Sequence, residues 1–264
     1  MLRLSGNGTK CQKRVRVPVT LIETFTMKID PARIEAHRGA SSAFPENTML
    51  AFEAAHRAGA LSIETDMSLL ADGSFAIFHD DRLGRTVSGD AMIGSLGAED
   101  VRQLDAGAWR GAEFAGAMVP LLDDLLDWQE TVGIRFNLEM KCHGTRQGEA
   151  ASALAAHLAG CDLSALMVSS FDAAFLAAIR TTLPALPRAL IAGTLPPDWR
   201  DLSETLDLEA LHLGHETVTP QMVTDIHAAG MKCRVYTVNK AKDMTRMRDA
   251  GVDTMITDLP DTFL

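Results

Sequence analysis

The strongest constraint on the fold is a regular alternation of apolar runs and helical segments through the second half of the chain. The apolar runs read as strands because they are short and bounded by turn residues. They cover Ile134–Lys141, Leu166–Ser169, Arg188–Ala192, Ala210–Leu213, Cys233–Val238 and Thr254–Thr257. Helices are predicted between them at Asp172–Thr182, Asp198–Leu206, Pro220–Ala229 and Lys240–Ala250. Strands that alternate with helices favour a parallel sheet, and repetition over this length favours a closed barrel over an open doubly wound sheet.

The first part of the chain continues this pattern. A strand is predicted at Arg33–Ala36, and it runs into a loop in which Gly39 allows a tight backbone turn. A helix follows, with Asn47 or Thr48 as its N-cap and Gly59 as its stop. This first unit is again a strand followed by a helix.

A hairpin adds one strand to the count. Two strands, Leu61–Leu70 and Phe75–His79, flank an Asp72-Gly73 pair, which is a strong hairpin signal. The count therefore reaches nine strands rather than eight, and we attribute the surplus strand to this hairpin. A two-residue turn at this pair would place residues whose numbers sum to 145 opposite each other, so His79 should arrive beside Asp66.

The remaining segments set the domain organisation. Residues 82–120 are rich in Gly and Ala without a long periodic run, and they read as an insertion of short helices and loops. A helix is predicted to follow at Leu121–Thr131. We expect one domain over residues 31–264, a TIM-type (β/α)8 barrel with a small insertion after the third strand. Residues 1–30 form a basic leader that is predicted to be disordered.

Composition excludes several classes of function. The chain has 264 residues and a net charge of −10, which argues against a nucleic-acid binder that works through bulk charge. Its four cysteines show no paired spacing, so they read as free thiols in a reducing compartment, and a cytoplasmic location is expected. No signal peptide and no integral membrane segment is predicted. The sequence leaves the oligomeric state open, with a homo-oligomer as one option.

Acidic side chains gather on two of the predicted strands. Glu64 and Asp66 are two residues apart, so both carboxylates lie on one face, where they repel each other unless a cation or a proton lies between them. Carboxylate oxygens are the ligands that Mg²⁺ or Ca²⁺ prefers, and the segment also ends in two candidate proton-transfer groups, His37 and His79. The alternative is an ordinary hairpin with two solvated acids and a capping histidine.

The strand at residues 134–141 extends this set. Glu139 and Lys141 share one of its faces, where buried charges would be costly without partners. In the functional interpretation, Glu139 is a third metal ligand and Lys141 contacts a phosphate. In the alternative, the two side chains form an exposed pair on a solvated face. His215 lies just after another strand, and a substrate contact is one option for it.

An ordered set of motifs resembles the glycerophosphodiester phosphodiesterase family. The match runs from about Arg33 to the end of the chain. It consists of His37-Arg38-Gly39, Pro45-Glu46-Asn47-Thr48, Ile63-Glu64-Thr65-Asp66, Asp72-Gly73, Phe78-His79-Asp80-Asp81, Leu138-Glu139-Met140-Lys141, Thr237-Val238-Asn239 and Ile256-Thr257-Asp258. Three further segments, around Trp109, His212 and Tyr236, look closest to the cytosolic bacterial branch that is linked to glycerol-3-phosphate uptake. Tyr236 departs from the Trp that many relatives carry there.

The resemblance implies a TIM-type barrel and a complete catalytic set. One divalent ion, Mg²⁺ or Ca²⁺, would be held by Glu64, Asp66 and Glu139. His37 and His79 would be the acid–base pair, and the residues 82–120 would cap the site. Substrate contacts would come from Arg38, Lys141, His215, Tyr236 and Asn239. The implied reaction converts a small glycerophosphodiester, such as glycerophosphocholine or glycerophosphoethanolamine, to glycerol 3-phosphate and an alcohol.

Other functions on the same scaffold stay open at this stage. A phospholipase-type phosphodiesterase would need an apolar patch, and the insertion holds few large apolar residues. A non-catalytic barrel that binds a phosphate ligand would be expected to lack a histidine or an acid of the set, and this chain has them all. A sugar isomerase or aldolase would need a Schiff-base lysine or a histidine-rich metal site, and neither stands out.

Overall fold

The computed structural model describes residues 28–144 and 146–264. The expectations for the basic leader therefore fall almost entirely outside the described residues. Within the described part of the chain, no helix is both long enough and apolar enough to cross a lipid bilayer.

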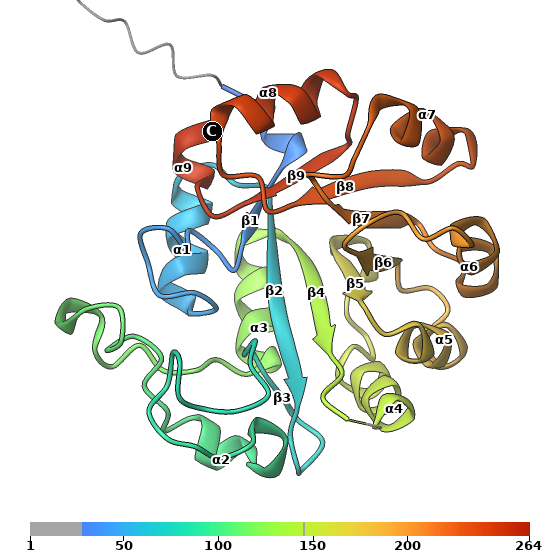
Figure 1. Ribbon diagram of the computed structural model, residues 1–264. Helices are drawn as coiled ribbons and strands as arrows, with labels where there is room; N and C mark the ends of the chain where they lie inside the picture. The colour runs from blue at the N-terminus through green and yellow to red at the C-terminus, as the bar shows by residue number, and fades with distance from the viewer. Residues whose placement is uncertain (1–27, 145) are drawn as a thin grey trace, which may run out of the picture.

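Eight parallel strands close into a barrel, as predicted (Figure 1). The sheet runs in the order β1-β9-β8-β7-β6-β5-β4-β2-β3, and pairing between β1 and β2 closes it. The strands are β1 (Ile34–His37), β2 (Ser62–Leu69), β3 (Phe75–Ala76), β4 (Arg135–Lys141), β5 (Leu166–Ser170), β6 (Arg188–Ala192), β7 (Ala210–Gly214), β8 (Lys232–Tyr236) and β9 (Thr254–Thr257). Only β3 is antiparallel to its neighbour among these strands, which confirms that the surplus strand belongs to the hairpin.

Helices surround the barrel and bury its outer face (Figure 1). The α-helices of the described residues are α1 (Met49–Arg57), α2 (Ala98–Val101), α3 (Leu122–Val132), α4 (Gln147–His157), α5 (Ala173–Thr182), α6 (Trp199–Leu206), α7 (Pro220–Ala228), α8 (Ala241–Asp249) and α9 (Pro260–Phe263), of which α2 belongs to the insertion. Of the two predicted N-caps for α1, Thr48 is the one that accepts a hydrogen bond from a backbone N–H of the helix. The side chain of Asn47 instead points at β2.

The hairpin register differs from the prediction by one residue. Ser68 pairs with Ala76 and Leu69 with Phe75, so opposed residue numbers sum to 144 instead of 145. The difference arises because the backbone N–H of Leu70 donates to the carbonyl of Ser74, which leaves a three-residue loop with Gly73 at φ +90°. Phe78 rather than His79 therefore bonds the backbone of Asp66, and His79 lies one residue beyond.

The insertion follows β3 and has its own small apolar cluster. It contains α2, two short 3-10 helices (Ile93–Ser95 and Ala112–Phe114) and loops. Its buried side chains, which include Leu83, Val87, Ile93 and Val101, form one apolar cluster with Ala76 of β3. Figure 1 shows this segment in green beside β2 and β3, near the end of the barrel where β2 finishes.

Candidate active site

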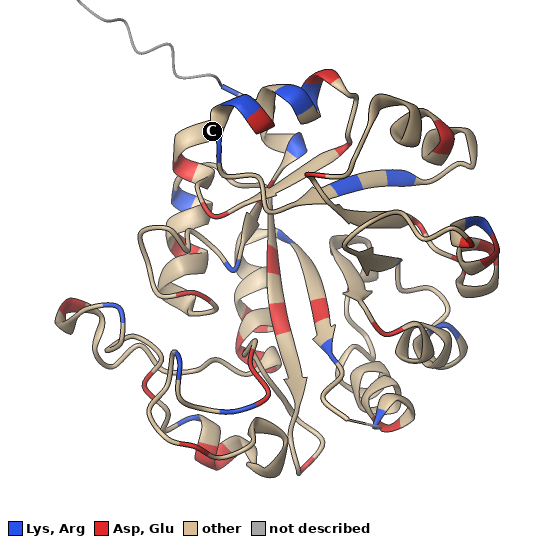
Figure 2. Ribbon diagram, in the orientation of Figure 1, with Lys and Arg blue, Asp and Glu red and all other residues tan. Residues whose placement is uncertain are grey.

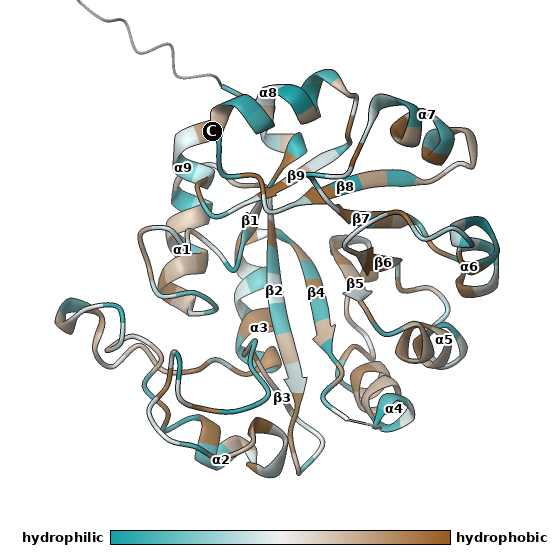
Figure 3. Cartoon of the chain, in the orientation of Figure 1, coloured by the Kyte–Doolittle hydropathy of each residue, from teal (hydrophilic) through white to brown (hydrophobic). Residues whose placement is uncertain are grey.

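Three acidic side chains on the neighbouring strands β2 and β4 meet inside the barrel. Glu64 and Asp66 come from β2, and Asp66 lies directly across from Glu139 of β4 in the parallel register. Carboxylate oxygens of the three residues lie within 4.8 Å of one another, and all three residues are buried. Figure 2 shows acidic bands on β2 and β4, and Figure 3 shows hydrophilic bands between apolar ones on the same two strands.

The electrostatics of this cluster fit a bound divalent cation. Burial and the negative charges of Asp66 and Glu139 raise the pKa of Glu64 well above its usual range. Burial and the charge of Asp66 likewise raise the pKa of Glu139. Among the described residues, the buried Oε1 of Glu64 has no hydrogen-bond partner. A hard cation with oxygen ligands would supply the missing contact and offset the repulsion, so the residues present could hold such an ion.

Two cationic side chains flank the acids. The Nε of Arg38 lies 2.9 Å from Oδ2 of Asp66, and the Nζ of Lys141 lies 3.0 Å from its Oδ1 and also contacts Glu139. Although burial opposes ionisation, these two cations hold the pKa of Asp66 below its usual range. Positive charge is therefore concentrated beside the acid cluster, as a site for an anionic substrate requires.

The loop between β1 and α1 holds Asp66 in place. Asn47 donates a hydrogen bond of 2.8 Å to Oδ2 of Asp66 and accepts one of 2.9 Å from the hydroxyl of Thr65. Gly39 allows the loop to fold against α1, because it has φ +83° and a Cβ there would lie 2.6 Å from the backbone of Ala51.

His37, at the end of β1, is oriented by a carboxylate. Its Nδ1 lies 2.6 Å from Oδ1 of Asp258, which also accepts a hydrogen bond from Ser41. Asn239 donates to the other oxygen of Asp258 at 2.6 Å. Burial acts to raise the pKa of Asp258, but these hydrogen bonds hold it below its usual range. The ionised Asp258 accepts from Nδ1, which leaves Nε2 of His37 facing Glu64 at 3.8 Å.

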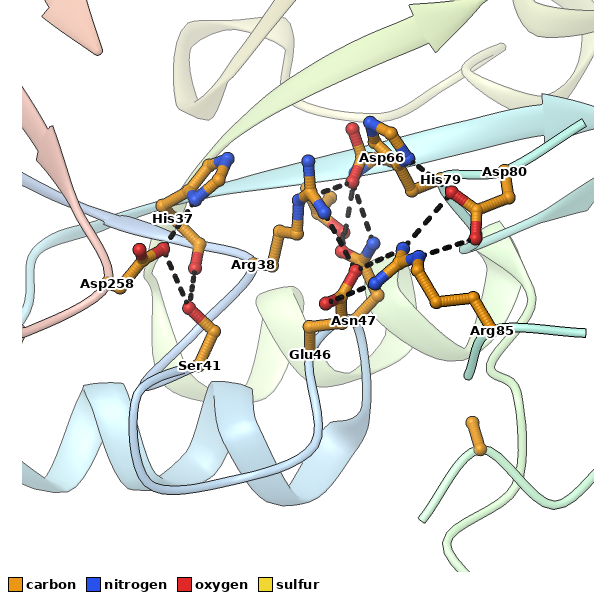
Figure 4. A network of polar contacts seen from close by, with 12 residues as sticks. His37, Arg38, Ser41, Glu46, Asn47, Asp66, His79, Asp80, Arg85 and Asp258 are labelled. Carbon is orange, nitrogen blue, oxygen red and sulfur yellow. Dashed lines mark hydrogen bonds and ion pairs between the residues drawn. The ribbon is translucent and has the colours of Figure 1, made fainter. Parts of the chain in front are cut away.

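His79 has the same arrangement on the other side of the cluster (Figure 4). Its Nδ1 lies 2.7 Å from Oδ1 of Asp80, and Asp80 is in turn bound by the guanidinium of Arg85 through contacts of 2.7 and 3.1 Å. Burial lowers the pKa of His79, so its imidazole is neutral at pH 7. Each of the two histidines therefore keeps Nδ1 on a carboxylate and has Nε2 available for proton transfer.

Arg85 connects the insertion to the first loop of the barrel. Besides Asp80, it binds Glu46 through two hydrogen bonds of 2.8 and 2.9 Å. Glu46 accepts a hydrogen bond of 2.7 Å from Arg38. Figure 4 shows the resulting chain of contacts from His79 through Arg85 to Arg38 and Asp66.

The remaining predicted contacts lie at the same end of the barrel but differ in their surroundings. Tyr236, at the end of β8, packs edge-on against the exposed ring of Phe171 at a centroid distance of 6.3 Å. His215 instead contacts Glu216 and Arg246 of α8. Asn239 is engaged with Asp258 and with the hydroxyl of Thr257.

Five polar residues support the site although the sequence interpretation gave them no role in it. They are Glu46, Asn47, Asp80, Arg85 and Asp258. Asp80 and Asp258 carry a usable signal, because Asp80 directly follows the predicted acid–base residue His79 and Asp258 directly follows the end of a predicted strand. Arg85 and Glu46 are separated by 39 residues and carry no such signal.

Comparison with known proteins assigns the family. A sequence model of the glycerophosphoryl diester phosphodiesterase family matches residues 37–262. The chain belongs to this family. The barrel and the family membership inferred from the motifs are therefore confirmed.

Relatives with known names or structures support the assignment. A glycerophosphodiester phosphodiesterase of Caldanaerobacter subterraneus subsp. tengcongensis is 31% identical over 87% of this chain and 95% of its own length. A phosphodiesterase of Oleispira antarctica, solved with its product sn-glycerol-3-phosphate, is 32% identical with a TM-score of 0.83 over 87% of this chain and 94% of that one. A glycerophosphodiester phosphodiesterase of Agrobacterium tumefaciens is 27% identical with a TM-score of 0.75, over 88% of this chain and 98% of that one.

Proposed function

We propose that this family member hydrolyses glycerophosphodiesters to glycerol 3-phosphate and an alcohol. The observation that carries the proposal is the joint placement of three carboxylates, two cations and two carboxylate-bound histidines at one end of the barrel. In barrels of this type, that end is where active sites are found. Glycerophosphocholine and glycerophosphoethanolamine are the substrates we expect.

Each group has a role that follows from its surroundings. Glu64, Asp66 and Glu139 would hold one Mg²⁺ or Ca²⁺, which supplies positive charge at a phosphate oxygen. Arg38 and Lys141 lie beside these acids and would bind the other phosphate oxygens through charge-assisted hydrogen bonds.

Proton transfer would be shared between the two imidazoles. One of His37 and His79 takes a proton from the attacking oxygen, and the other gives one to the oxygen of the departing alcohol. The attacker is either a water molecule or a hydroxyl of the substrate's own glycerol, which would pass through a cyclic phosphate. Both routes use the same pair of histidines.

Product analysis tests this proposal. Purified protein with Mg²⁺ or Ca²⁺ is expected to release glycerol 3-phosphate and choline in equal amounts from glycerophosphocholine, measured by enzyme-coupled detection of each product. Protein that binds glycerophosphocholine without consuming it would instead support a non-catalytic phosphate-ligand barrel. Release of phosphocholine and glycerol would contradict the proposed bond cleavage.

A second candidate substrate is a phosphodiester with a larger apolar group. A cavity of about 280 Å³ lies between β4 and the insertion, and Leu69, Ile93 and Met140 form much of its wall. Lys141 lines the same cavity, so an apolar alcohol could extend into it from the phosphate site. A panel that compares glycerophosphocholine with lysophospholipid and intact phospholipid separates the two candidates by their kcat/KM values.

We also propose that the enzyme works in the cytoplasm. Cys142, Cys161 and Cys233 are free thiols in the described part of the chain, as a reducing compartment favours. Fractionation of cells that express the chain, followed by immunodetection, tests this location.

Substitution of Arg85 tests the contact network between the insertion and the barrel. Arg85→Ala is expected to lower kcat by about 10-fold or more, because Asp80 and Glu46 lose the cation that fixes them and His79 and Arg38 lose their orientation. Arg85→Lys should recover only part of the loss, since an ammonium cannot bind both carboxylates in the same bidentate geometry. Steady-state kinetics with glycerophosphocholine measure the effect.

The matched control is Arg102→Ala. Arg102 also comes from the insertion and binds both oxygens of a carboxylate, that of Asp124, but it does so away from the site. Equal activity of Arg85→Ala and Arg102→Ala, both near the wild-type value, would show that the network has no role in catalysis.

A further inference from the structure

A small cavity lies inside the barrel, next to the acid cluster. Its volume is about 30 Å³, which is enough for a water molecule or a single hydroxyl-bearing carbon but not for a whole substrate. Its walls include His37, Glu64, Glu139, Tyr236 and the imidazole of His212. The cavity therefore adjoins the proposed metal and phosphate site, and neither Arg38 nor Lys141 is among its lining residues.

His212 is the unusual member of this wall. It lies on β7 with only 1% of its surface exposed, and its Nε2 is buried without a hydrogen-bond partner among the described residues. A buried polar nitrogen that is left unpaired destabilises the folded protein. The Nε2 of His212 is therefore expected to gain a hydrogen-bond partner when a ligand enters the cavity.

Several other polar groups on that side of the barrel are hydrogen-bonded to one another. Ser169 donates its hydroxyl hydrogen to Asn137 at 2.8 Å, and Asn137 donates to Glu35 at 3.0 Å. Arg234 binds the second oxygen of Glu35 at 3.0 Å. These contacts run along the wall of the cavity, which Asn137 and Ser169 also line, and none of these hydrogen bonds involves His212. The Nε of Arg234 is, like the Nε2 of His212, buried without a hydrogen-bond partner among the described residues.

The chemistry of His212 selects the kind of partner. Burial lowers its pKa well below the usual range, with a further contribution from the charge of Arg234, so the ring is neutral. A neutral imidazole presents one donor and one acceptor, which matches a hydroxyl group.

We propose that this cavity is a hydroxyl-binding subsite in which His212 hydrogen-bonds a hydroxyl of the substrate's glycerol group. The inference rests on the proposed function and deepens it, since it names the part of the substrate that the enzyme recognises. A water molecule has the same hydrogen-bonding capacity and is the other source of a hydroxyl, so the experiment must separate the two.

Equilibrium binding of two phosphate monoesters makes this separation. Glycerol 3-phosphate and n-propyl phosphate share the phosphate and the three-carbon chain, and only the first has hydroxyls. With Mg²⁺ present, isothermal titration calorimetry is expected to show that the wild-type protein binds glycerol 3-phosphate about 10-fold or more tightly. His212→Phe, which keeps a planar ring without nitrogen, should remove this preference and leave binding of n-propyl phosphate unchanged.

Two further variants keep the test independent of folding. His212→Gln retains a donor and an acceptor and should keep part of the preference, whereas His56→Phe, on the outer helix α1, should keep all of it. His212→Phe should unfold at the same temperature as the wild type or higher, because the lost nitrogen has no partner in the protein.

The outcomes are distinct. A preference for glycerol 3-phosphate that is unchanged in His212→Phe would mean that the cavity holds only water, and would overturn the proposal. An equal loss of affinity for both monoesters in His212→Phe would mean that His212 supports the phosphate site instead, and would also overturn it. Wild-type protein that binds both monoesters equally, or binds neither, would overturn it as well.

The reaction and the subsite can also fail separately. The wild type could prefer glycerol 3-phosphate over n-propyl phosphate, and His212→Phe could lose that preference, while no glycerol 3-phosphate is released from glycerophosphocholine. That result would overturn the proposed reaction and leave the subsite standing.

Discussion

His37→Ala and His79→Ala are each expected to lower kcat for glycerophosphocholine by about 10²–10⁴-fold, which is the usual contribution of a positioned acid or base. The fold should survive, because both side chains are partly exposed and neither contributes to the apolar core. Steady-state kinetics measure the loss, and thermal unfolding followed by circular dichroism checks the fold. KM should change much less than kcat, since the imidazoles act on protons that move in the transition state.

A matched control comes from outside the site. His227 on α7 also bonds a carboxylate, with its Nε2 2.8 Å from Asp253, but it is exposed and remote from the acid cluster. His227→Ala should keep wild-type kcat. Turnover close to the wild-type value in either His37→Ala or His79→Ala would refute the assignment of the acid–base pair.

The second large effect concerns the metal. Chelation is expected to abolish glycerol 3-phosphate release, and added Mg²⁺ or Ca²⁺ should restore it in the wild type. Glu64→Gln should lose activity by about 100-fold or more even at saturating Mg²⁺, because one anionic ligand of a hard cation is gone.

Stability distinguishes this explanation from simple damage to the fold. In the metal-free protein, Glu64→Gln removes a buried like charge, so its unfolding temperature should equal or exceed that of the wild type. Added Mg²⁺ at about 100 times its Kd should stabilise the wild type by about 2.7 kcal/mol, and it should stabilise Glu64→Gln far less. The control is Glu149→Gln on the exposed face of α4. Equal metal-induced shifts in all three proteins would place the ion elsewhere.

The sequence alone predicted the architecture because the barrel is built from repeated local signals. Each strand-helix unit carries its own periodicity, and turn residues mark the boundaries. The hairpin shows the limit of such reasoning. Asp72-Gly73 is typical of a two-residue turn, but the chain closes a three-residue loop around it, and the register moves by one.

Neighbours within one strand follow from spacing alone, whereas Glu139 joined the predicted metal ligands through the functional interpretation and the family resemblance. The spacing of Glu64 and Asp66 places both on one face, yet the position of Glu139 beside Asp66 depends on the register of β2 against β4. Asp258 reaches His37 only because β9 pairs with β1 and closes the barrel. Contacts of this kind depend on long-range pairing, for which a single sequence carries no local signal.

The two histidines of the His212–His215 segment show the same limit. Alternation along β7 turns His212 into the barrel, where it lines the small cavity. His215 lies beyond the strand end and contacts Arg246. Sequence analysis gave a substrate contact as one option for His215, which lies just after a predicted strand, and gave none for His212. The burial of His212 without a partner is visible only in the structure.

The most direct test of the central claim is the position of the metal. Crystals grown with Mn²⁺, whose anomalous scattering identifies it, are expected to show one ion bound to oxygens of Glu64, Asp66 and Glu139 at about 2.0–2.6 Å. His37 and His79 should stand on either side of that ion. A crystal that shows no ion among these carboxylates, or one in which the five side chains do not share a site, would contradict the account.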